Sequence, residues 1–209
     1  RVSQEVRVRF SLRPPKFMDI SKYNNLLELF YNQYKQEKSS QIFLQSLKEG
    51  RQRYTWEDIY LNILKLSDEF ENIIKKDDRC LLISENRPEW MISDLAIMLA
   101  SGITVPAYTT YTERDYEYLI NDCEPSVIII SDITQYNKIK NIIKTKSFIK
   151  KLISFENFQN DNEVISIKKI FDKREYKKKD LLSLPIKRSN IACIIYTSGT
   201  QGNPKGVML

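Results

Sequence analysis

Two hydrophobic spacings alternate along this chain. Apolar side chains recur every three or four positions between residues 26 and 34 and between residues 56 and 70, which predicts helices with one face toward a core. Continuous apolar runs at residues 80–83 and 127–130 are typical of strands that are buried on both faces, and residues 152–155 are predicted as a further strand. This alternation predicts an α/β fold, in which a mainly parallel sheet is flanked by helices on both faces.

Local end signals refine the positions of the helices. Residues 55–58 and 112–115 each begin with Thr and end with Asp, which is the layout of a capping box, and they predict two helix starts. Pro88 suits the first turn of another helix, and Gly102 is expected to end that helix. The remaining predicted elements are strands at residues 42–44, 103–108 and 164–165 and helices at residues 136–143 and 167–171.

The weakest patterns lie at residues 1–21 and 156–190. The first stretch alternates basic and apolar positions before a Pro-Pro pair, so we expect an edge strand or an irregular leader. The second stretch is interpreted as a surface excursion, with its charged run at residues 173–180 forming a solvated surface or linker. Residues 191–196 are then expected to form a buried strand, and residues 206–209 a further strand.

Composition limits the classes of function. The chain has 209 residues, of which 42% are hydrophobic, and this is enough to bury a core. The formal net charge of +6 is scattered, and the charged run at residues 173–180 carries acids among its bases, so no nucleic-acid partner is expected. The longest apolar window is too short to span a bilayer, and we expect no transmembrane helix.

Cysteine and histidine usage narrows the chemistry. Cys80, Cys123 and Cys193 show no CxxC spacing, and we interpret them as buried free thiols of a reducing, cytosolic protein. The chain contains no histidine. A zinc site is therefore not expected, and a Ser/His or Cys/His catalytic pair within these residues is excluded.

Most of the candidate chemistry lies in residues 197–206, with the sequence TSGTQGNPKG. Gly199, Gly202 and Gly206 can adopt positive φ, which lets successive backbone N–H groups converge on an anion. The hydroxyl groups of this loop donate further hydrogen bonds, and Lys205 adds a positive charge. These groups predict a phosphate-binding loop.

The spacing distinguishes this loop from a Walker A motif. Pro204 directly precedes Lys205, where Walker A has glycine. A Walker lysine is followed by a helix whose N-terminus faces the phosphate, whereas residues 206–209 here indicate a strand. The pattern therefore predicts a strand, a phosphate loop and a second strand.

The sequence of residues 196–209, YTSGTQGNPKGVML, resembles the signature phosphate loop of the AMP-forming acyl-activating enzymes. This superfamily includes acyl-CoA synthetases, luciferases and the adenylation domains of peptide synthetases. Gln201 departs from the pattern, since the family often has a second Thr there. Residues 54–60 and 81–132 are similar to the N-terminal region of the same enzymes, most closely of long-chain fatty-acid:CoA ligases.

The resemblance implies a domain organisation and a site. Residues 1–21 would form a leader, and residues 22–209 the N-terminal portion of the large AMP-binding domain of an acyl-adenylating enzyme, truncated after the phosphate loop. The chain is expected to be a piece of a longer protein. The residues that the resemblance assigns to the ATP phosphates are Thr197, Ser198, Gly199, Thr200, Gly202 and Lys205. No catalytic residue or metal ligand is assigned, because the adenine, magnesium, acyl and CoA sites of the family lie beyond the position of Leu209.

The resemblance also implies a reaction. A long-chain fatty acid would attack the α-phosphate of ATP with Mg²⁺, giving acyl-AMP and pyrophosphate, and the thiol of CoA would then displace AMP. Such an enzyme is expected in the cytoplasm, and peripheral membrane contact is compatible with its substrate. The 209 residues alone are expected to be inactive.

Two alternatives remain open for the function. The first is another adenylating enzyme, which loads a carrier-protein thiol. The second is an inert, truncated ATP-binding module. Residues 108–112, which follow the carboxyl end of a predicted strand, are a weaker candidate for a ligand contact. The apolar neighbours of Cys193 favour a packing thiol over a nucleophile.

Overall fold

The computed structural model describes the backbone of residues 9–10 and, with side chains, residues 19–45, 53–158, 163–179, 181, 185–197 and 204–209. The helices are α1 (Leu26–Gln36), α2 (Trp56–Phe70), α3 (Pro88–Leu99), α4 (Glu113–Cys123), α5 (Ile133–Ile143) and α6 (Ile167–Phe171), with a 3-10 turn at Ile20–Lys22. The strands are β1 (Arg9–Phe10), β2 (Ile42–Gln45), β3 (Arg53–Thr55), β4 (Arg79–Ile83), β5 (Ile103–Ala107), β6 (Val127–Ile130), β7 (Lys151–Ser154), β8 (Val164–Ser166), β9 (Ile194–Thr197) and β10 (Lys205–Met208).

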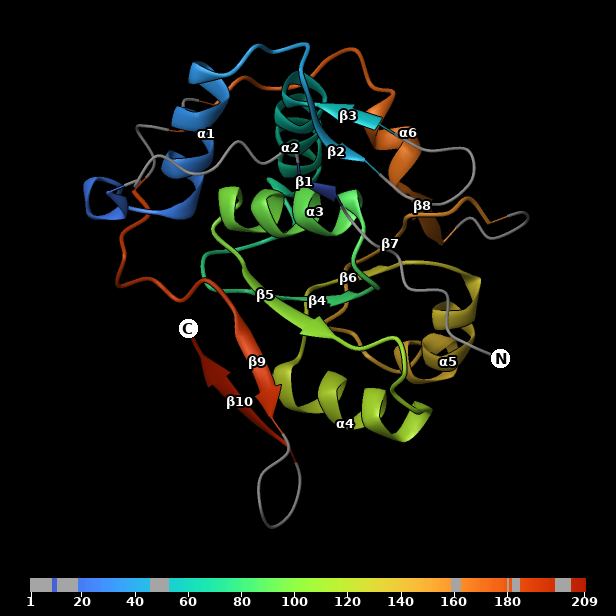
Figure 1. Ribbon diagram of the computed structural model, residues 1–209. Coiled ribbons are helices and arrows are strands. Elements are labelled where there is room, and N and C mark those ends of the chain that lie inside the picture. The colour runs from blue at the N-terminus through green and yellow to red at the C-terminus, as the bar shows by residue number, and fades with distance from the viewer. Residues whose placement is uncertain are drawn as a thin grey trace.

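A five-stranded parallel sheet forms the centre of the fold, with the strand order β5-β4-β6-β7-β8. Helices cover both of its faces, as Figure 1 shows: α2 and α3 lie above the sheet, and α4 and α5 lie below it. The predicted α/β fold with a mainly parallel sheet is therefore confirmed. A smaller antiparallel sheet joins β1, β2 and β3, and of the two alternatives expected for the leader, an edge strand is present at residues 9–10.

The central strand β4 shows why these residues form such a sheet. Cys80 and Leu82 pack into the core with α2 and α3, whereas Leu81 and Ile83 pack into the second core with α4 and α5. Successive side chains of a strand point to opposite faces, so a strand that is covered on both faces needs a continuous apolar run. The same reason explains the all-buried sequence of β6.

The order of the strands fixes the faces of the helices. The chain leaves β4 for β5 on one side and then crosses past β4 to β6 on the other side. Parallel crossovers are right-handed, so reversing their direction moves the connecting helix to the opposite face. This places α3 on one face of the sheet and α4 on the other.

Local capping explains several helix boundaries. Both predicted capping boxes are present, with Thr55 and Asp58 opening α2 and residues 112–115 opening α4. Pro88 occupies the first turn of α3, as expected. Helix α5 begins at Ile133, three residues earlier than the predicted start at residue 136, because the carboxylate of Asp132 accepts hydrogen bonds from the first-turn N–H groups.

The end of α3 differs from the prediction at Gly102. The left-handed residue is Ser101, with φ 62°, and its N–H donates to the carbonyl of Met98 at 2.9 Å. The N–H of Gly102 closes the turn on the carbonyl of Ile97 at 2.9 Å. Glycine relieves crowding at position 102, since a Cβ there would lie 3.0 Å from Cγ2 of Ile74 and 3.1 Å from Cγ2 of Ile97, and these side chains would have to shift slightly.

Residues 156–190 are more than the expected surface excursion. Strand β8 extends the main sheet by pairing in parallel with β7, and α6 follows it as predicted. The charged run that follows contacts α2, where Lys173 pairs with Glu69 and Lys177 pairs with Glu71. The run is therefore tied to the helix layer, although the more exposed of these ion pairs, between Lys177 and Glu71, adds little stability.

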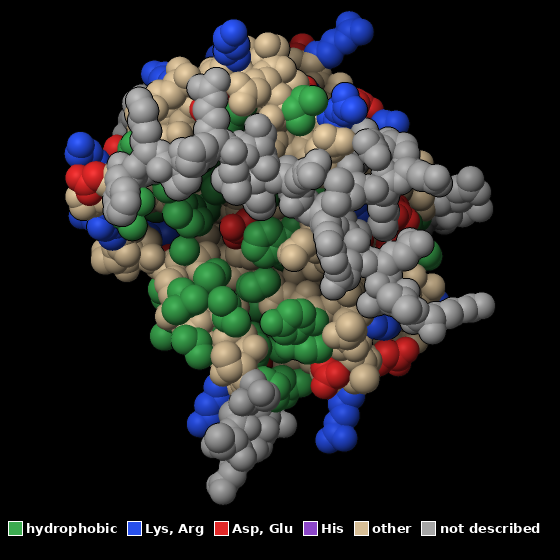
Figure 2. Space-filling model, viewed as in Figure 1, with side chains coloured by type: hydrophobic (Ala, Val, Ile, Leu, Met, Phe, Trp, Pro, Cys, Tyr) green, Lys and Arg blue, Asp and Glu red, His purple; other side chains and the backbone are tan. Residues whose placement is uncertain are grey.

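The chain ends in an antiparallel pair of strands, β9 and β10. The expectation of a buried strand at residues 191–196 is wrong in part: β9 is shorter, and only Tyr196 within it is buried. The hydrophobic side chains of this pair remain largely exposed, with 37% for Ile195 and 65% for Met208. Figure 2 shows hydrophobic side chains gathered on the face that carries β9 and β10.

The structure bears on two further predictions, the burial of the cysteines and the absence of a transmembrane helix. All three cysteines are free, and burial raises the pKa of the thiols of Cys80 and Cys123, the latter to about 12. Cys193 is only partly buried, contrary to the expectation for a core thiol, because it lies in the segment that leads into β9. Among the described residues, no helix has both the length and the hydrophobicity needed to cross a membrane.

Two isoleucines offer a matched test of this core. Ile129 on β6 is fully buried between the helix layers, whereas Ile133 at the start of α5 is 46% exposed. We expect Ile129→Ala to lower the free energy of unfolding by about 2–5 kcal/mol, because it leaves a cavity. Ile133→Ala should change it by about 0.5 kcal/mol or less. Urea unfolding measures both values, and equal losses would contradict the burial of β6 between two helix layers.

Candidate active site: the loop between β9 and β10

The strand pair β9–β10 flanks the predicted phosphate loop. Thr197, the last residue of β9, is the register partner of Lys205, the first residue of β10, and both residues are exposed. The first and last residues of the predicted set are therefore cross-strand neighbours, which places a hydroxyl and an ammonium group at the mouth of one loop. The other four predicted residues, Ser198, Gly199, Thr200 and Gly202, lie outside the described residues. The predicted strand, loop and strand arrangement is confirmed for its two strands.

The segment that enters β9 joins the loop to the main sheet. Cys193 forms a parallel bridge with Thr104 of β5, whose N–H donates to the carbonyl of Ala192 at 3.3 Å. Strand β9 therefore runs in the same direction as β5, and it delivers Thr197 toward the carboxyl side of the sheet. Ligands of parallel α/β sheets bind on this side.

Helix α4 contacts both ends of the loop. The hydroxyl of Tyr196, next to Thr197, donates to the carboxylate of Asp122. The hydroxyl of Tyr118 donates at 2.8 Å to the carbonyl of Pro204, which directly precedes Lys205. Tyr118 and Asp122 are not among the predicted site residues: their spacing of four residues on a helix is visible in the sequence, but their partners are not.

Gly206 faces the ring of Tyr196 across the strand pair. A Cβ at this position would lie 2.7 Å from Cγ2 of Ile194 and 3.4 Å from Cζ of Tyr196. Contacts as short as the first do not occur without a shift of the neighbour. The glycine therefore leaves room for the side chain of Ile194 and lets β10 lie against the ring of Tyr196.

The weaker candidate, residues 108–112, also lies at the carboxyl side of the sheet. The side chain of Tyr108 is 68% exposed, just after β5. The ammonium of Lys138 on α5 donates to the carbonyls of Thr109 at 2.8 Å and Tyr111 at 2.9 Å. These bonds hold the turn in place, and its role in binding remains a prediction.

The residues that open α3 have a structural explanation. Glu89 is 4% exposed and accepts hydrogen bonds from the Tyr54 hydroxyl at 3.0 Å and from Nε of Arg87 at 2.9 Å. The guanidinium of Arg87 also lies over the ring of Phe155 at 5.1 Å. Trp90, in the first turn of α3, packs against the core. Arg87 and Glu89 are thus bonded to other protein groups, and their burial is explained without a ligand.

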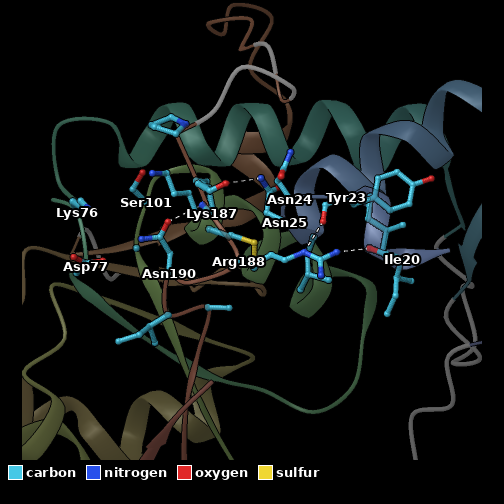
Figure 3. A pocket seen from close by; sticks show the side chains of 18 residues that line it. Ile20, Tyr23, Asn24, Asn25, Lys76, Asp77, Ser101, Lys187, Arg188 and Asn190 are labelled. Carbon is cyan, nitrogen blue, oxygen red and sulfur yellow. Dashed lines mark hydrogen bonds between the residues drawn. The ribbon is translucent and has the colours of Figure 1, made fainter. Parts of the chain in front are cut away.

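A separate hollow of about 440 Å³ lies at the end of the sheet where the parallel strands begin (Figure 3). It is lined by residues that precede strands, such as Asp77 and Gly102, and by the start of α1. Arg188 at its rim donates to the carbonyls of Tyr23 at 2.9 Å and Ile20 at 2.6 Å. The hollow lies at the amino ends of the parallel strands, so it is distinct from the loop between β9 and β10.

Solved structures of known enzymes share the fold of this chain. The anthranilate CoA ligase AuaEII in complex with anthranoyl-AMP superposes with a TM-score of 0.75 at 18% identity, over 91% of this chain and 36% of that chain. A red-emitting luciferase from Phrixothrix hirtus superposes with a TM-score of 0.69 at 20% identity, over 87% of this chain and 34% of that chain. The fold is thus that of the first part of an adenylate-forming enzyme.

The family model described as AMP-binding enzyme matches residues 30–209, and the chain belongs to this family. The long-chain-fatty-acid–CoA ligase of Bacillus subtilis is 30% identical in an alignment that covers 75% of this chain and 32% of that protein. The long-chain-fatty-acid–CoA ligase ACSBG1 of Rattus norvegicus is 27% identical in an alignment that covers 78% of this chain and 23% of that protein. The chain therefore spans a third or less of the length of these relatives. The predicted resemblance to the superfamily is confirmed.

The close contact at Gly206 leads to a test of the strand pair. We expect Gly206→Ala to destabilise β9 and β10 by about 1–3 kcal/mol, because the added methyl overpacks against Ile194. The neighbouring change Val207→Ala, at a side chain that is 43% exposed, serves as the control. Hydrogen–deuterium exchange should show faster exchange across both strands only in Gly206→Ala. Equal exchange in the two variants would contradict the close packing.

Proposed function

We propose that the protein to which this chain belongs activates a long-chain fatty acid with ATP. The carboxylate attacks the α-phosphate to give acyl-AMP and pyrophosphate, and the thiol of CoA then displaces AMP to give acyl-CoA. The observation that carries this proposal is the sequence of residues 196–209, framed by β9 and β10 in a chain of the AMP-binding family. The fatty-acid substrate is supported by the names of the relatives, which are long-chain-fatty-acid–CoA ligases.

In this proposal the loop binds the β- and γ-phosphates of ATP. The residues are Thr197, Ser198, Gly199, Thr200, Gly202 and Lys205. Negative charge accumulates on the pyrophosphate as the bond to the α-phosphate breaks, and pre-positioned N–H, hydroxyl and ammonium groups stabilise it. Thr197 and Lys205 are register partners, so a phosphate at the loop mouth can contact both side chains.

Mg²⁺ enters the proposed reaction as the counter-ion of ATP. Among the described residues, no group of three or more Cys, Asp or Glu side chains could hold a metal ion. No step is therefore assigned to a metal held by these residues. CoA is a co-substrate, and its contacts are not assigned to this part of the protein.

The proposed domain organisation follows the same reasoning. Residues 22–209 would form the N-terminal portion of the AMP-binding domain, and the family match from residue 30 supports most of this range. A cytoplasmic location is supported by the three free cysteines. Peripheral membrane contact would give access to an apolar substrate, and this too is a proposal.

Fatty-acid-dependent ATP–pyrophosphate exchange by the full-length protein tests the activity and the loop together. The double change Thr200→Ala and Lys205→Ala should lower the exchange rate about 100-fold or more, because it removes pre-positioned groups that stabilise the leaving charge. Lys168→Ala on α6, an exposed lysine far from the loop in sequence, is the control and should retain the rate. An unchanged rate in the double variant would contradict the assignment of the loop.

The acceptor of the acyl group needs its own measurement. With palmitate, ATP and CoA, the full-length protein is expected to release AMP and form palmitoyl-CoA, which mass spectrometry detects. Formation of acyl-AMP without transfer to CoA would instead favour the enzyme that loads a carrier-protein thiol. Absence of both products with a range of fatty acids would contradict the proposed function.

A further inference from the structure

We propose that Tyr118 and Asp122 of α4 are positioning residues that fix the two ends of the phosphate loop. This inference rests on the proposed function, because it concerns how the loop between β9 and β10 is held for ATP. Both residues act through other groups, and neither is proposed to touch ATP.

The two contacts lie next to the two described residues of the predicted site. Tyr196 donates its hydroxyl hydrogen to Asp122, and Tyr196 directly precedes Thr197. Tyr118 donates to the carbonyl of Pro204, which directly precedes Lys205. The incoming and outgoing ends of the loop are therefore each tied to the same helix, one residue away from a proposed phosphate ligand.

The geometry of α4 makes both contacts compatible. Residues four apart share one face of a helix, so Tyr118 and Asp122 both face the strand pair. The rings of Tyr118 and Tyr196 meet edge to face, with centroids 6.5 Å apart and an interplanar angle of 88°. This is a favourable arrangement of two aromatic rings. Two hydrogen bonds and the contact between the rings of Tyr118 and Tyr196 thus hold the strand pair against α4.

Burial of Tyr196 stabilises its hydrogen bond to Asp122. Its side chain is 7% exposed, and burial together with the hydrogen bond to Asp122 raises the pKa of the phenol above its usual value. The phenol therefore keeps its proton over the physiological pH range and continues to donate. If the carboxylate of Asp122 were removed, the hydroxyl of Tyr196 would lose this hydrogen bond while its side chain stayed buried.

Helix α4 is a firm support for the loop. Its N-terminus carries a complete capping box at residues 112–115, and Leu119 and Ile120 are buried against the sheet. The hydroxyl of Tyr116 donates to Oε1 of Gln135 on α5 at 2.9 Å, which ties α4 to the next helix. Small displacements of a group that contacts the reacting atoms cost much of the rate, so a loop anchored to such a helix is better placed than a free one.

The helix also offers matched variants. Asp122→Ala removes the acceptor for Tyr196, whereas Asp122→Asn keeps an acceptor oxygen of the same size and serves as the conservative rescue. Tyr118→Phe removes one hydroxyl and keeps the ring contact. Glu117→Ala is the control, because Glu117 is exposed on the same helix next to Tyr118.

The experiment measures ATP–pyrophosphate exchange by the full-length protein while ATP and fatty acid are varied separately. We expect Asp122→Ala and Tyr118→Phe each to lower kcat/KM for ATP about threefold to tenfold relative to Glu117→Ala, the effect of one lost hydrogen bond. The KM for the fatty acid should not change, and Asp122→Asn should recover most of the loss. The losses from Tyr196→Phe and Asp122→Ala should not add in the double variant, since they break the same bond.

Two results would overturn the inference. The first is a kcat/KM for ATP in Asp122→Ala and Tyr118→Phe within twofold of that of Glu117→Ala. The second is an equal decrease in kcat/KM for ATP and in kcat/KM for the fatty acid, together with a lowered Tm. This result would show a purely structural role. If the unaltered protein shows no exchange, the proposed function fails separately. Calorimetric titration with ATP then decides: weaker binding by Asp122→Ala than by Glu117→Ala supports the positioning role, and equal binding, or no binding by the unaltered protein, rejects it.

Discussion

Strand β4 is buried between two strands and two layers of helices, and this burial governs how the other elements are arranged. Its side chains alternate between a core shared with α2 and α3 and a core shared with α4 and α5. Because both faces are apolar, both must be covered, and right-handed crossovers allow this only if the chain changes direction at β4. The change of direction places α4 under the face of the sheet next to β5, where the chain later returns as β9.

The candidate site uses this arrangement. The parallel bridge between Cys193 and Thr104 aligns the last strand pair with the sheet, and α4 then contacts both ends of the loop. A loop rich in glycine and hydroxyl groups binds an anion well only if its ends are fixed, because free ends would lose conformational entropy on binding. A helix with a capped start and a buried face provides such fixed points.

The prediction from sequence succeeded where local chemistry decides structure. The capping boxes at residues 55–58 and 112–115, the buried strand at residues 127–130 and helix α6 all follow from short-range patterns. It failed where packing decides. Ser101, and not Gly102, adopts the left-handed turn, while Gly102 lies close to Ile74, and the predicted strand at residues 164–165 joins the main sheet as β8 although its stretch was interpreted as a surface excursion.

The class of fold and the chemistry of the loop follow from the amino-acid sequence, because strand and helix periods and the spacing of glycine, hydroxyl and lysine residues are local properties. The residues that hold that loop follow instead from how distant parts of the chain pack together. Tyr118 and Pro204 are 86 positions apart, and Asp122 and Tyr196 are 74 positions apart. No local pattern connects residues at such separations; they meet because the order of the strands and the hand of the crossovers bring α4 and the last strand pair to the same side of the sheet.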